Sequence, residues 1–416
     1  MADREPSISV DASLPPGGMF AALRHPNYRL FFCGQLISLC GTWMQNVAQP
    51  WLVYELTGSK LLLGLVSATS SLPVLVLSFV GGVTADRYPK RYVMFFTQTW
   101  LMTSALIYWV LIATHHINVP WILVLSLFSG IAMAFDVPTR QSFVIELVGK
   151  KDLMNAIALN SSMFNAARII GPSIGGVIIA SMGIANCFLL NSLSFLAIIV
   201  AILRMDIRPR PVNGLSNSIL KDILEGLNYA RRQPVIRTAL LISAVSSVFG
   251  APYMVLLPVF ANDVFHIGAK GLGFMMAASG LGALTGALGL ASMGDFRRKG
   301  LLLLGGILVF SATIQLFGWS HWINLSIFCL VIAGSSMTLY RSTCNTLLQT
   351  TTPDALRGRV MALFHLGFAG VAPLGSLQAG FVAQYFGVHL ALGLGATVLG
   401  ISALIILLTV PEMRKA

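Results

Sequence analysis

Charged residues are scarce in this sequence. Asp, Glu, Lys and Arg make up only 10% of its 416 residues, against about 25% in a typical soluble domain, and 56% of the residues are hydrophobic. This composition, with a mean hydropathy of +0.79, excludes a water-soluble fold. The sequence also lacks the polar and apolar alternation of a membrane β-barrel strand. We therefore expect an all-α membrane protein whose crossings are helices of about 20 residues.

Cysteine and acidic residues are also few, and each shortage excludes a class of protein. The five cysteines lie inside apolar runs without metal-ligand spacing, which argues against zinc or redox chemistry. The 15 Asp and Glu against 27 Lys and Arg leave a net charge of +12, which in a soluble chain would indicate nucleic acid. Here the basic residues follow the predicted membrane topology, and no nucleic-acid partner is expected. The sequence shows no Gly-x-x-x-x-Gly-Lys-(Ser/Thr) nucleotide loop, and we expect no cofactor.

The apolar runs predict twelve transmembrane helices. The runs divide where polar or turn residues collect, at 115–118, 181–186, 318–324 and 384–389. The first eighteen residues are largely polar and precede a span too long for a signal-peptide core, and no cleavage is expected. The expected spans are 27–56, 60–85, 92–114, 119–147, 154–181, 184–204, 236–262, 269–294, 299–318, 321–349, 357–385 and 388–410.

The basic residues collect on one side of this topology. Of the 27 Lys and Arg, only Lys60 and Lys270 fall in the opposite loops, and three arginines lie within spans. By the positive-inside rule, the basic side is the cytoplasm. This distribution predicts an even number of spans in the lipid bilayer of a bacterial inner membrane, with both termini cytoplasmic.

The longest hydrophilic stretch lies midway along the chain and predicts a linker at 205–235. Apolar residues recur in it at helical spacing from Ile219 to Leu227. They predict an amphipathic helix that lies on the membrane surface or simply bridges the two halves. The linker divides the chain into an N-terminal bundle, 1–204, and a C-terminal bundle, 236–416, with six spans in each.

The two halves resemble each other. Asp86 after the second span and Asp295 after the eighth both precede basic clusters. Pro172 and Pro373 interrupt the fifth and eleventh spans at corresponding places. Two pseudo-symmetric six-helix bundles are the architecture of alternating-access transporters, whose halves rock around a site near the midplane of the membrane.

A dense charge cluster follows the second span. Residues 81–91 read Gly-Gly-Val-Thr-Ala-Asp-Arg-Tyr-Pro-Lys-Arg, and the glycines let helices approach closely just before the charges. This segment resembles the signature loop of the major facilitator superfamily, Gly-x-Leu-Ala-Asp-Arg-x-Gly-Arg-(Lys/Arg), from which Thr84 and Pro89 depart. The matching positions are Gly82, Ala85, Asp86, Arg87, Lys90 and Arg91.

The resemblance implies a conformational role for this loop. In that family the aspartate latches onto a helix of the other half, and the basic residues pair with an acid that ends the fourth span. Glu146 occupies the place of that acid. Such a latch stabilises the outward-facing state through charge-assisted contacts. The alternative is that Arg87, Lys90 and Arg91 serve only as topology determinants.

The fifth span carries a second motif. Its Gly-Pro-Ser-Ile-Gly-Gly segment resembles the superfamily's antiporter motif, which is found mainly in exporters, with Ala167 in place of the leading glycine. Proline removes a backbone hydrogen bond and glycine removes bulk, which predicts a kinked helix that packs closely on the other half. Ordinary helix packing is the alternative. The motif residues are Gly171, Pro172, Gly175 and Gly176.

Two further segments narrow the resemblance. Residues 134–141 and 159–161, with the arginine before Gly-Pro, look like the subgroup of enterobactin exporters and macrolide-efflux-like proteins. One position departs from many drug exporters, which carry an arginine in the fourth span about four residues before a glycine. Ser126 stands there, before Gly130, and a proton-relay role does not transfer to it.

Four ionisable residues lie well inside spans, where each costs roughly 2.5 to 3.5 kcal/mol to insert and needs a partner or a cavity. Asp136 and Arg140 are four apart and can neutralise each other on one helix face, or serve proton coupling or substrate binding. Arg168 lies near mid-membrane and meets either an anionic substrate or a carboxylate such as Asp136. Arg341, the second-half counterpart of Arg140, is expected at a cytoplasmic gate or in a cavity wall.

Uncharged polar residues within spans indicate a cavity. Each one alone is more often a bond between helices, but as a set they favour a polar pathway. Aromatic residues in the same spans, including Trp43, Phe164 and Tyr253, can form walls for a bulky substrate. The polar set is Gln45, Asn46, Gln49, Asn160, Asn165, His365 and Gln378.

The resemblance implies a secondary active transporter of a small amphipathic molecule such as a siderophore or a drug. We expect a monomer that exports this substrate by alternating access in exchange for protons, with the proton gradient as its energy source. An importer or uniporter of a nutrient or lipid is the alternative, since the same cavity would serve it. A membrane-embedded enzyme or receptor is disfavoured because the sequence has no Ser-His-acid constellation and no metal-ligand spacing.

Overall fold

A computed structural model describes residues 18, 20–206, 219–294, 296 and 298–415 of the chain. Residues 1–17, at the polar amino terminus, and Asp295 of the predicted repeat lie outside the described residues. Nearly all of the described chain is helical, which confirms the all-α fold class. The N-terminal bundle consists of α1 (Pro26–Thr57), α2 (Lys60–Arg87), α3 (Lys90–Ala113), α4 (Val119–Val148), α5 (Leu153–Met182) and α6 (Ile184–Arg204).

The C-terminal bundle has the same number of long helical segments over the described residues, but two of them are composite. Its seventh and eleventh crossings each contain short π-helical turns, η2, η3 and η4, which widen the helix and are frequent at functional sites. The segments are α8 (Pro234–Val245), η2 (Ser246–Gly250), α9 (Tyr253–Val259), η3 (Phe260–Val264), α10 (Gly268–Ser292), α11 (Lys299–Trp319), α12 (Ile323–Thr351), α13 (Asp354–His365), η4 (Leu366–Gly370), α14 (Ala372–Phe386) and α15 (Val388–Thr409).

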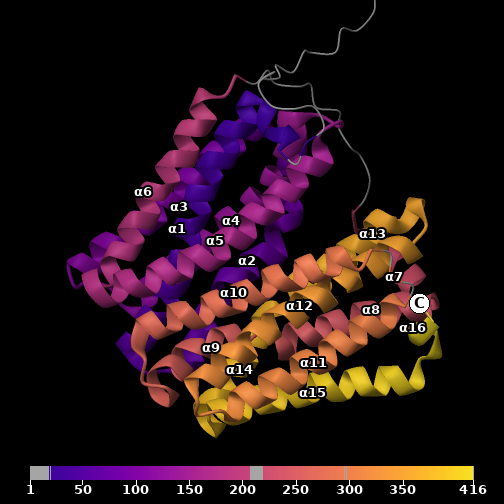
Figure 1. Cartoon of the computed structure of the whole chain (residues 1–416). Helices are drawn as coiled ribbons and strands as arrows, with labels where there is room; N and C mark the ends of the chain where they lie inside the picture. The colour runs from indigo at the N-terminus through magenta and orange to yellow at the C-terminus, as the bar shows by residue number, and fades with distance from the viewer. Residues whose placement is uncertain (1–17, 19, 207–218, 295, 297, 416) are drawn as a thin grey trace, which may run out of the picture.

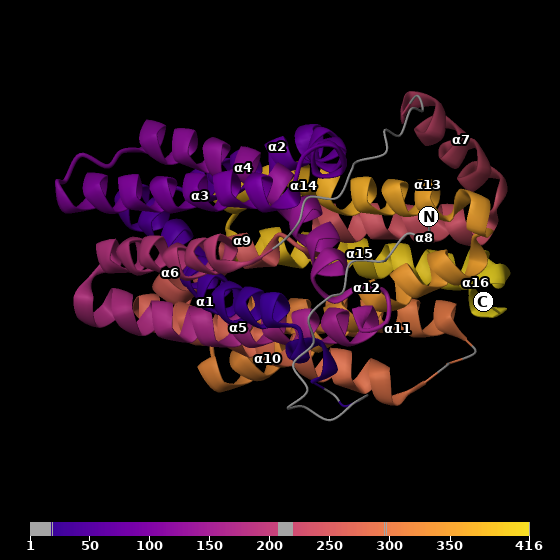
Figure 2. The same cartoon turned by 90° about the horizontal axis from the view of Figure 1, so that it is seen from above.

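Three short helices complete the described chain. A 3-10 turn, η1 (Ala21–Arg24), precedes α1, and α16 (Pro411–Lys415) follows α15. The linker forms α7 (Ile219–Arg232), and Arg359 of α13 donates to Glu225 of α7 at 2.7 Å. Figure 2 shows α7 beside α13 at the edge of the C-terminal bundle. The linker helix is therefore fastened to the C-terminal bundle rather than suspended between the two.

Local turn chemistry explains several of the helix ends. Gly58 ends α1 in the left-handed conformation, with φ of 58°, which glycine adopts without steric cost. The Ser59 side chain then accepts from the backbone N–H of Leu62 and caps α2. Asn118 caps α4 in the same way. Because these signals are visible in the sequence, the predicted span boundaries agree with the structure to within about three residues.

Eleven of the helical segments in the described chain are long and apolar enough to cross a membrane, and α1 is the long helix that falls short. Polar residues such as Gln35, Gln45, Asn46 and Gln49 reduce its hydropathy. Even so, α1 is 32 residues long and packs against α5 and α6 inside the N-terminal bundle. Neighbouring helices therefore cover most of its polar face.

The two bundles touch at one end and separate at the other (Figure 1). We call the end with the loops around 88–89, 149–152 and 352–353 the basic end, and the end with the loops around 58–59 and 265–267 the far end. Contact between bundles is made mainly by α5 with α10 and by α2 with α14. Figure 1 shows the bundles diverging toward the basic end, where α13 and α7 lie.

Hydrogen bonds between the two bundles hold the far end closed. Tyr54 donates to the Asp263 carboxylate at 2.5 Å, which joins the end of α1 to η3. The Gln384 side-chain oxygen accepts from the backbone N–H of Lys60 at 2.9 Å, so a residue of α14 caps the first turn of α2. Closer to mid-membrane, the hydroxyls of Ser67 and Ser376 lie 3.0 Å apart. This structure is therefore closed at the far end.

Candidate functional site

A cavity of about 450 Å³ opens on the inner wall of the N-terminal bundle, among α1, α4 and α5. Its volume falls in the range of small-molecule sites. The side-chain oxygen of Asn160 is buried there without a hydrogen-bond partner. The wall therefore offers one unbonded polar atom to a ligand. It is lined by Leu39, Arg140, Gln141, Val144, Ile145, Leu153, Ile157, Asn160, Ser161, Met163 and Phe164.

Asp136 is turned away from this cavity. Its carboxylate is 1% exposed and accepts from Thr97 at 2.9 Å and from Gln98 at 2.7 Å, both on α3. Its second oxygen lies 3.8 Å from Nε of Arg140. The structure therefore brings Asp136 and Arg140 together on one helix face. Of the two, only Arg140 reaches the cavity wall.

Arg168 points across the interface between the bundles. One of its terminal nitrogens donates to the Ser279 hydroxyl of α10 at 3.4 Å, and that hydroxyl lies 2.8 Å from the Tyr253 hydroxyl. The guanidinium carbon of Arg168 lies 5.7 Å from the centre of the Trp43 ring, and its Nε is buried without a partner. The sequence-based alternative of a salt bridge from Arg168 to Asp136 is wrong, because Asp136 pairs with Arg140.

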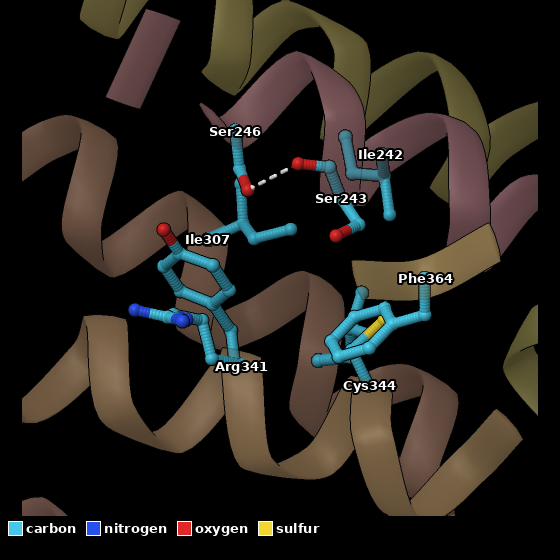
Figure 3. A pocket seen from close by; sticks show the side chains of 9 residues that line it. Ile242, Ser243, Ser246, Ile307, Arg341, Cys344 and Phe364 are labelled. Atoms are coloured by element: carbon cyan, nitrogen blue, oxygen red, sulfur yellow. Dashed lines mark hydrogen bonds between the residues drawn. The ribbon is translucent and has the colours of Figure 1, made fainter. Parts of the chain in front are cut away.

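Arg341 projects from α12 toward η4 of the same bundle. Its side chain is exposed, and its guanidinium carbon lies 3.5 Å from the centre of the Phe368 ring. Figure 3 shows the guanidinium pointing away from Cys344 and Phe364. The pocket drawn there encloses only about 10 Å³, the space of a single water molecule. This pocket is therefore too small to hold a substrate.

The polar residues of α1 do not act as one set. The Gln45 side-chain oxygen accepts from Asn191 of α6 at 2.5 Å, and Gln49 donates to Ser126 of α4 at 2.7 Å. Both bonds lie within the N-terminal bundle and join helices. Asn46 is exposed between them. Of these three, only Asn46 makes no such bond within the described residues.

The remaining predicted polar residues are scattered. His365 is exposed at the end of α13, with its ring 5.6 Å from that of Phe364. Asn165 donates to the backbone oxygen of Ser161 within its own helix at 2.9 Å. Gln378 is partly buried on α14. None of these three residues lines the cavity of about 450 Å³.

The signature loop is divided between bound and exposed residues. Lys90 forms an ion pair with Glu146, and Arg91 donates to the Leu203 backbone oxygen at 2.8 Å. Asp86 and Arg87 are exposed at the basic end, where the bundles have separated. The last residues of the loop are thus bonded to the N-terminal bundle, whereas the Asp86 side chain is exposed.

The Gly-Pro-x-x-Gly-Gly segment serves two interfaces. A methyl group added at Gly171 or Gly175 would lie within 3 Å of α1, at 2.5 Å from Trp43 Cβ and 2.9 Å from Met44 Cγ. One added at Gly176 would lie 3.0 Å from Cα of Gly273 in the other bundle. The helix runs through Pro172 without interruption. The predicted close packing of α5 on the other half is therefore present, and the small size of Gly176 allows it.

Several groups that make these contacts are not apparent from the sequence. Bonds between the bundles are formed by Tyr54, Asp263, Ser279 and Gln384, among others, yet tyrosine, serine and glutamine are ordinary in helices. Of these residues, Asp263 could be noticed in the sequence, because it is an acid at the far end of a crossing, just beyond the predicted boundary at 262. Its partner becomes visible only in three dimensions.

Two bundles of long apolar helices that are in contact at one end and separate at the other define a membrane transporter rather than an enzyme. A family model for transmembrane secretion effectors of the major facilitator superfamily matches residues 17–416. The chain belongs to this family. The superfamily and the not-an-enzyme prediction are thereby confirmed.

Curated relatives extend over nearly the whole chain. The multidrug efflux pump Tap of Mycolicibacterium fortuitum is 28% identical over 398 residues, 93% of this chain and 96% of its own length. The staphyloferrin A transporter of Staphylococcus aureus is 27% identical over 371 residues, 86% of this chain and 90% of its own. The enterobactin exporter EntS of Shigella boydii is 28% identical over 402 residues, 94% of each. The predicted resemblance to enterobactin exporters is confirmed.

Solved structures support the fold at lower identity. A peptide transporter of the POT family superposes with a TM-score of 0.76 at 13% identity, covering 98% of this chain and 99% of its own. A bacterial homologue of the lysosomal transporter Spinster, in an inward-facing and unoccupied conformation, gives 0.74 at 12% identity, covering 94% and 99%. These superpositions confirm the all-α membrane transporter fold.

Proposed function

We propose that this protein exports a small amphipathic molecule, such as a siderophore or a drug, across a bacterial inner membrane in exchange for protons. The basic end is the cytoplasmic end, both termini lie there, and the conformation described above faces inward. The protein works as a monomer in the lipid bilayer. It uses no cofactor, and the proton gradient supplies its energy.

One observation carries the export proposal: a segment resembling an exporter motif forms the seal between the bundles. Gly176 meets Gly273 at the crossing of α5 and α10, between mid-membrane and the far end. An exporter must open this crossing to release substrate outside and close it to reload from the cytoplasm. The exporters among the relatives support the same direction.

The signature loop acts as the opposite latch in this proposal. When the basic end closes, Asp86 approaches the C-terminal bundle and forms the contacts of the outward-facing state. The Lys90–Glu146 ion pair holds the end of the loop against α4 in the meantime. Arg91, bonded to the backbone at Leu203, fixes the same end against α6.

Direction of flux separates this proposal from an importer or uniporter. Cells that produce the wild type or Gly176→Leu would be loaded with catechol siderophores, macrolides and lipophilic cations, and intracellular retention measured. We expect lower retention of one compound with the wild type and no reduction with the variant. Gly289→Leu is the matched control, because Gly289 is exposed and a Cβ added there meets no atom within 4 Å. Greater uptake with the wild type would refute export.

Proton coupling rests on Asp136, the acid embedded deepest in the spans. Asp136→Asn removes the charge and keeps an oxygen that accepts from Thr97 and Gln98. The purified protein in vesicles would be tested for export with and without an imposed pH gradient. We expect the gradient to accelerate export by the wild type and to have no effect on the variant. Export by the wild type that ignores the gradient would refute the coupling and leave export intact.

A further inference from the structure

We infer that the substrate is an organic anion, held between Arg168 of the N-terminal bundle and Arg341 of the C-terminal bundle. The inference rests on the proposed transport function and names the chemical class of its substrate. It goes beyond a general amphipathic molecule, because it excludes cations. The anionic groups that fit are carboxylates and phenolates, for which the planar guanidinium provides paired donors.

The two arginines are placed as a pair. Arg168 projects from α5 toward Ser279, whose hydroxyl lies 2.8 Å from that of Tyr253. Arg341 follows Tyr340 on α12, and the rings of Tyr253 and Tyr340 both pack on Phe310 with ring centres 5.8 Å away. The two like charges on either side of this aromatic cluster repel each other. Each is embedded in a span, where an uncompensated cation costs roughly 2.5 to 3.5 kcal/mol. An anion bound between them would offset the repulsion and pair with both guanidinium groups at once.

The present contacts of these arginines do not neutralise them. Arg168 bonds a hydroxyl at 3.4 Å, at the long limit of a hydrogen bond, and its Nε is buried with no partner. Arg341 lies against the face of Phe368. A ring face attracts a cation weakly and leaves every N–H of the guanidinium available to a ligand. Among the described residues, no acidic side chain therefore neutralises these donors.

Acidic residues of the described chain stand elsewhere. Asp136 is buried against α3 and is already paired with Arg140. Glu55 and Asp263 lie at the far end, and Glu146 and Asp152 lie at the basic end. The wall of the pathway near mid-membrane therefore carries positive charge from both bundles. Such a wall attracts anions and rejects lipophilic cations of the same size.

The surroundings of Arg168 suit an anion with an apolar body. The Trp43 and Phe164 rings meet edge to face with centres 5.6 Å apart beside it. Phe164 also lines the cavity of about 450 Å³ that opens toward the basic end. A molecule with carboxylate or phenolate groups on an aromatic or aliphatic frame therefore finds both kinds of contact at one place.

The test uses three fluorescent probes of one shape: 1-pyrenebutyrate, the neutral 1-pyrenebutanol and the cationic 1-pyrenebutylamine. Equilibrium binding to the full-length purified protein in lipid nanodiscs would be measured, with protein-free nanodiscs subtracted. We expect the carboxylate to bind at least tenfold more tightly than the alcohol, and the amine more weakly than either. Equal binding of the three probes, or a preference for the amine, would overturn the inference.

Variants then assign the preference to the arginines. Arg168→Gln and Arg341→Gln are each expected to weaken carboxylate binding about tenfold and to leave alcohol binding unchanged. Arg168→Lys keeps the charge without the planar fork, and an intermediate loss is expected. Lys151→Gln, at an exposed loop position, is the control and should change nothing. If Arg168→Gln weakens all three probes equally, the arginine is structural and the inference fails.

The outcome stands apart from the proposed function. Binding at equilibrium depends on neither the direction of flux nor the pH gradient. A protein that binds the carboxylate through both arginines but imports it would refute export and keep the anion site. An exporter whose binding ignores probe charge would do the reverse. If a glutamine variant does not fold, the Lys variants of both arginines are measured instead, and an intermediate loss of carboxylate binding with unchanged alcohol binding is expected.

Discussion

The crossing of α5 and α10 allows a test of how the seal controls the conformational equilibrium. A methyl group added at Gly273 would lie 2.4 Å from the carbonyl oxygen of Pro172 and 2.9 Å from Cα of Gly176. Both are backbone atoms of the other bundle, which cannot rotate out of the way. Gly273→Ala is therefore expected to force the bundles apart at this crossing and to destabilise the conformation that is closed at the far end.

The magnitude follows from the overlap. The added carbon falls about 1 Å short of ordinary van der Waals distance, and overpacking of this kind typically costs 1–3 kcal/mol. A shift of that size changes the ratio of the two conformations by about 5- to 150-fold. The higher helix propensity of alanine, about 1 kcal/mol over glycine, applies to both conformations and cancels in their ratio.

Distances between spin labels at the basic end would report the shift. Labels on cysteines introduced at Lys151 and Thr350, both exposed, are expected to lie far apart in the wild type in a background without native cysteines. Gly273→Ala should add a population with a shorter distance. Gly289→Ala, on the same helix with open space around it, is the matched control. An unchanged distance distribution for Gly273→Ala would refute the steric argument.

Three further predictions concern other contacts of the structure. Tyr54→Phe removes the far-end hydrogen bond to the Asp263 carboxylate, which is worth about 1.5–3 kcal/mol. The short-distance population of the same labels should grow, and an unchanged population would mean that this bond does not stabilise the conformation closed at the far end. Lys90→Ala and Glu146→Ala should couple by about 0.5–3 kcal/mol in a double-mutant cycle of thermal unfolding, and additive effects would exclude a direct pair. Gly81→Ala places a methyl group 2.1 Å from the Ala134 oxygen and should lower the unfolding temperature, whereas Gly82→Ala, with nothing within 4 Å, should not.

The sequence predicted the crossings well because their signals are local. Apolar runs, glycines and capping residues occur within each segment, and Gly58 and Ser59 mark a helix boundary without reference to the rest of the chain. The composite crossings were not predicted. The π-helical turns η2 and η4 lie in segments whose composition differs little from that of an ordinary helix, and packing between helices decides their geometry.

Site residues were predicted by type, and their orientation was not. The cost of a charge in lipid singles out Asp136, Arg140, Arg168 and Arg341 from the sequence alone. Which of them meets which depends on the rotation of each helix, and a turn of one residue moves a side chain by about 100°. For this reason the sequence allowed two partners for Arg168, an anionic substrate or Asp136. The structure shows that Arg168 bonds Ser279 of the other bundle.

The low hydropathy of α1 has a consequence for the order in which the chain is made. Its Gln45 is satisfied by Asn191, which lies 146 residues later in the chain. At 5–20 residues per second, the ribosome takes about 7–30 s to synthesise that interval. The first crossing therefore reaches the bilayer before the helix that covers its polar face exists. During biogenesis α1 therefore stays beside the insertion machinery or in a water-accessible position until α6 emerges. If synthesis stalls before α6, the polar face of α1 stays uncovered and is accessible to quality-control proteases.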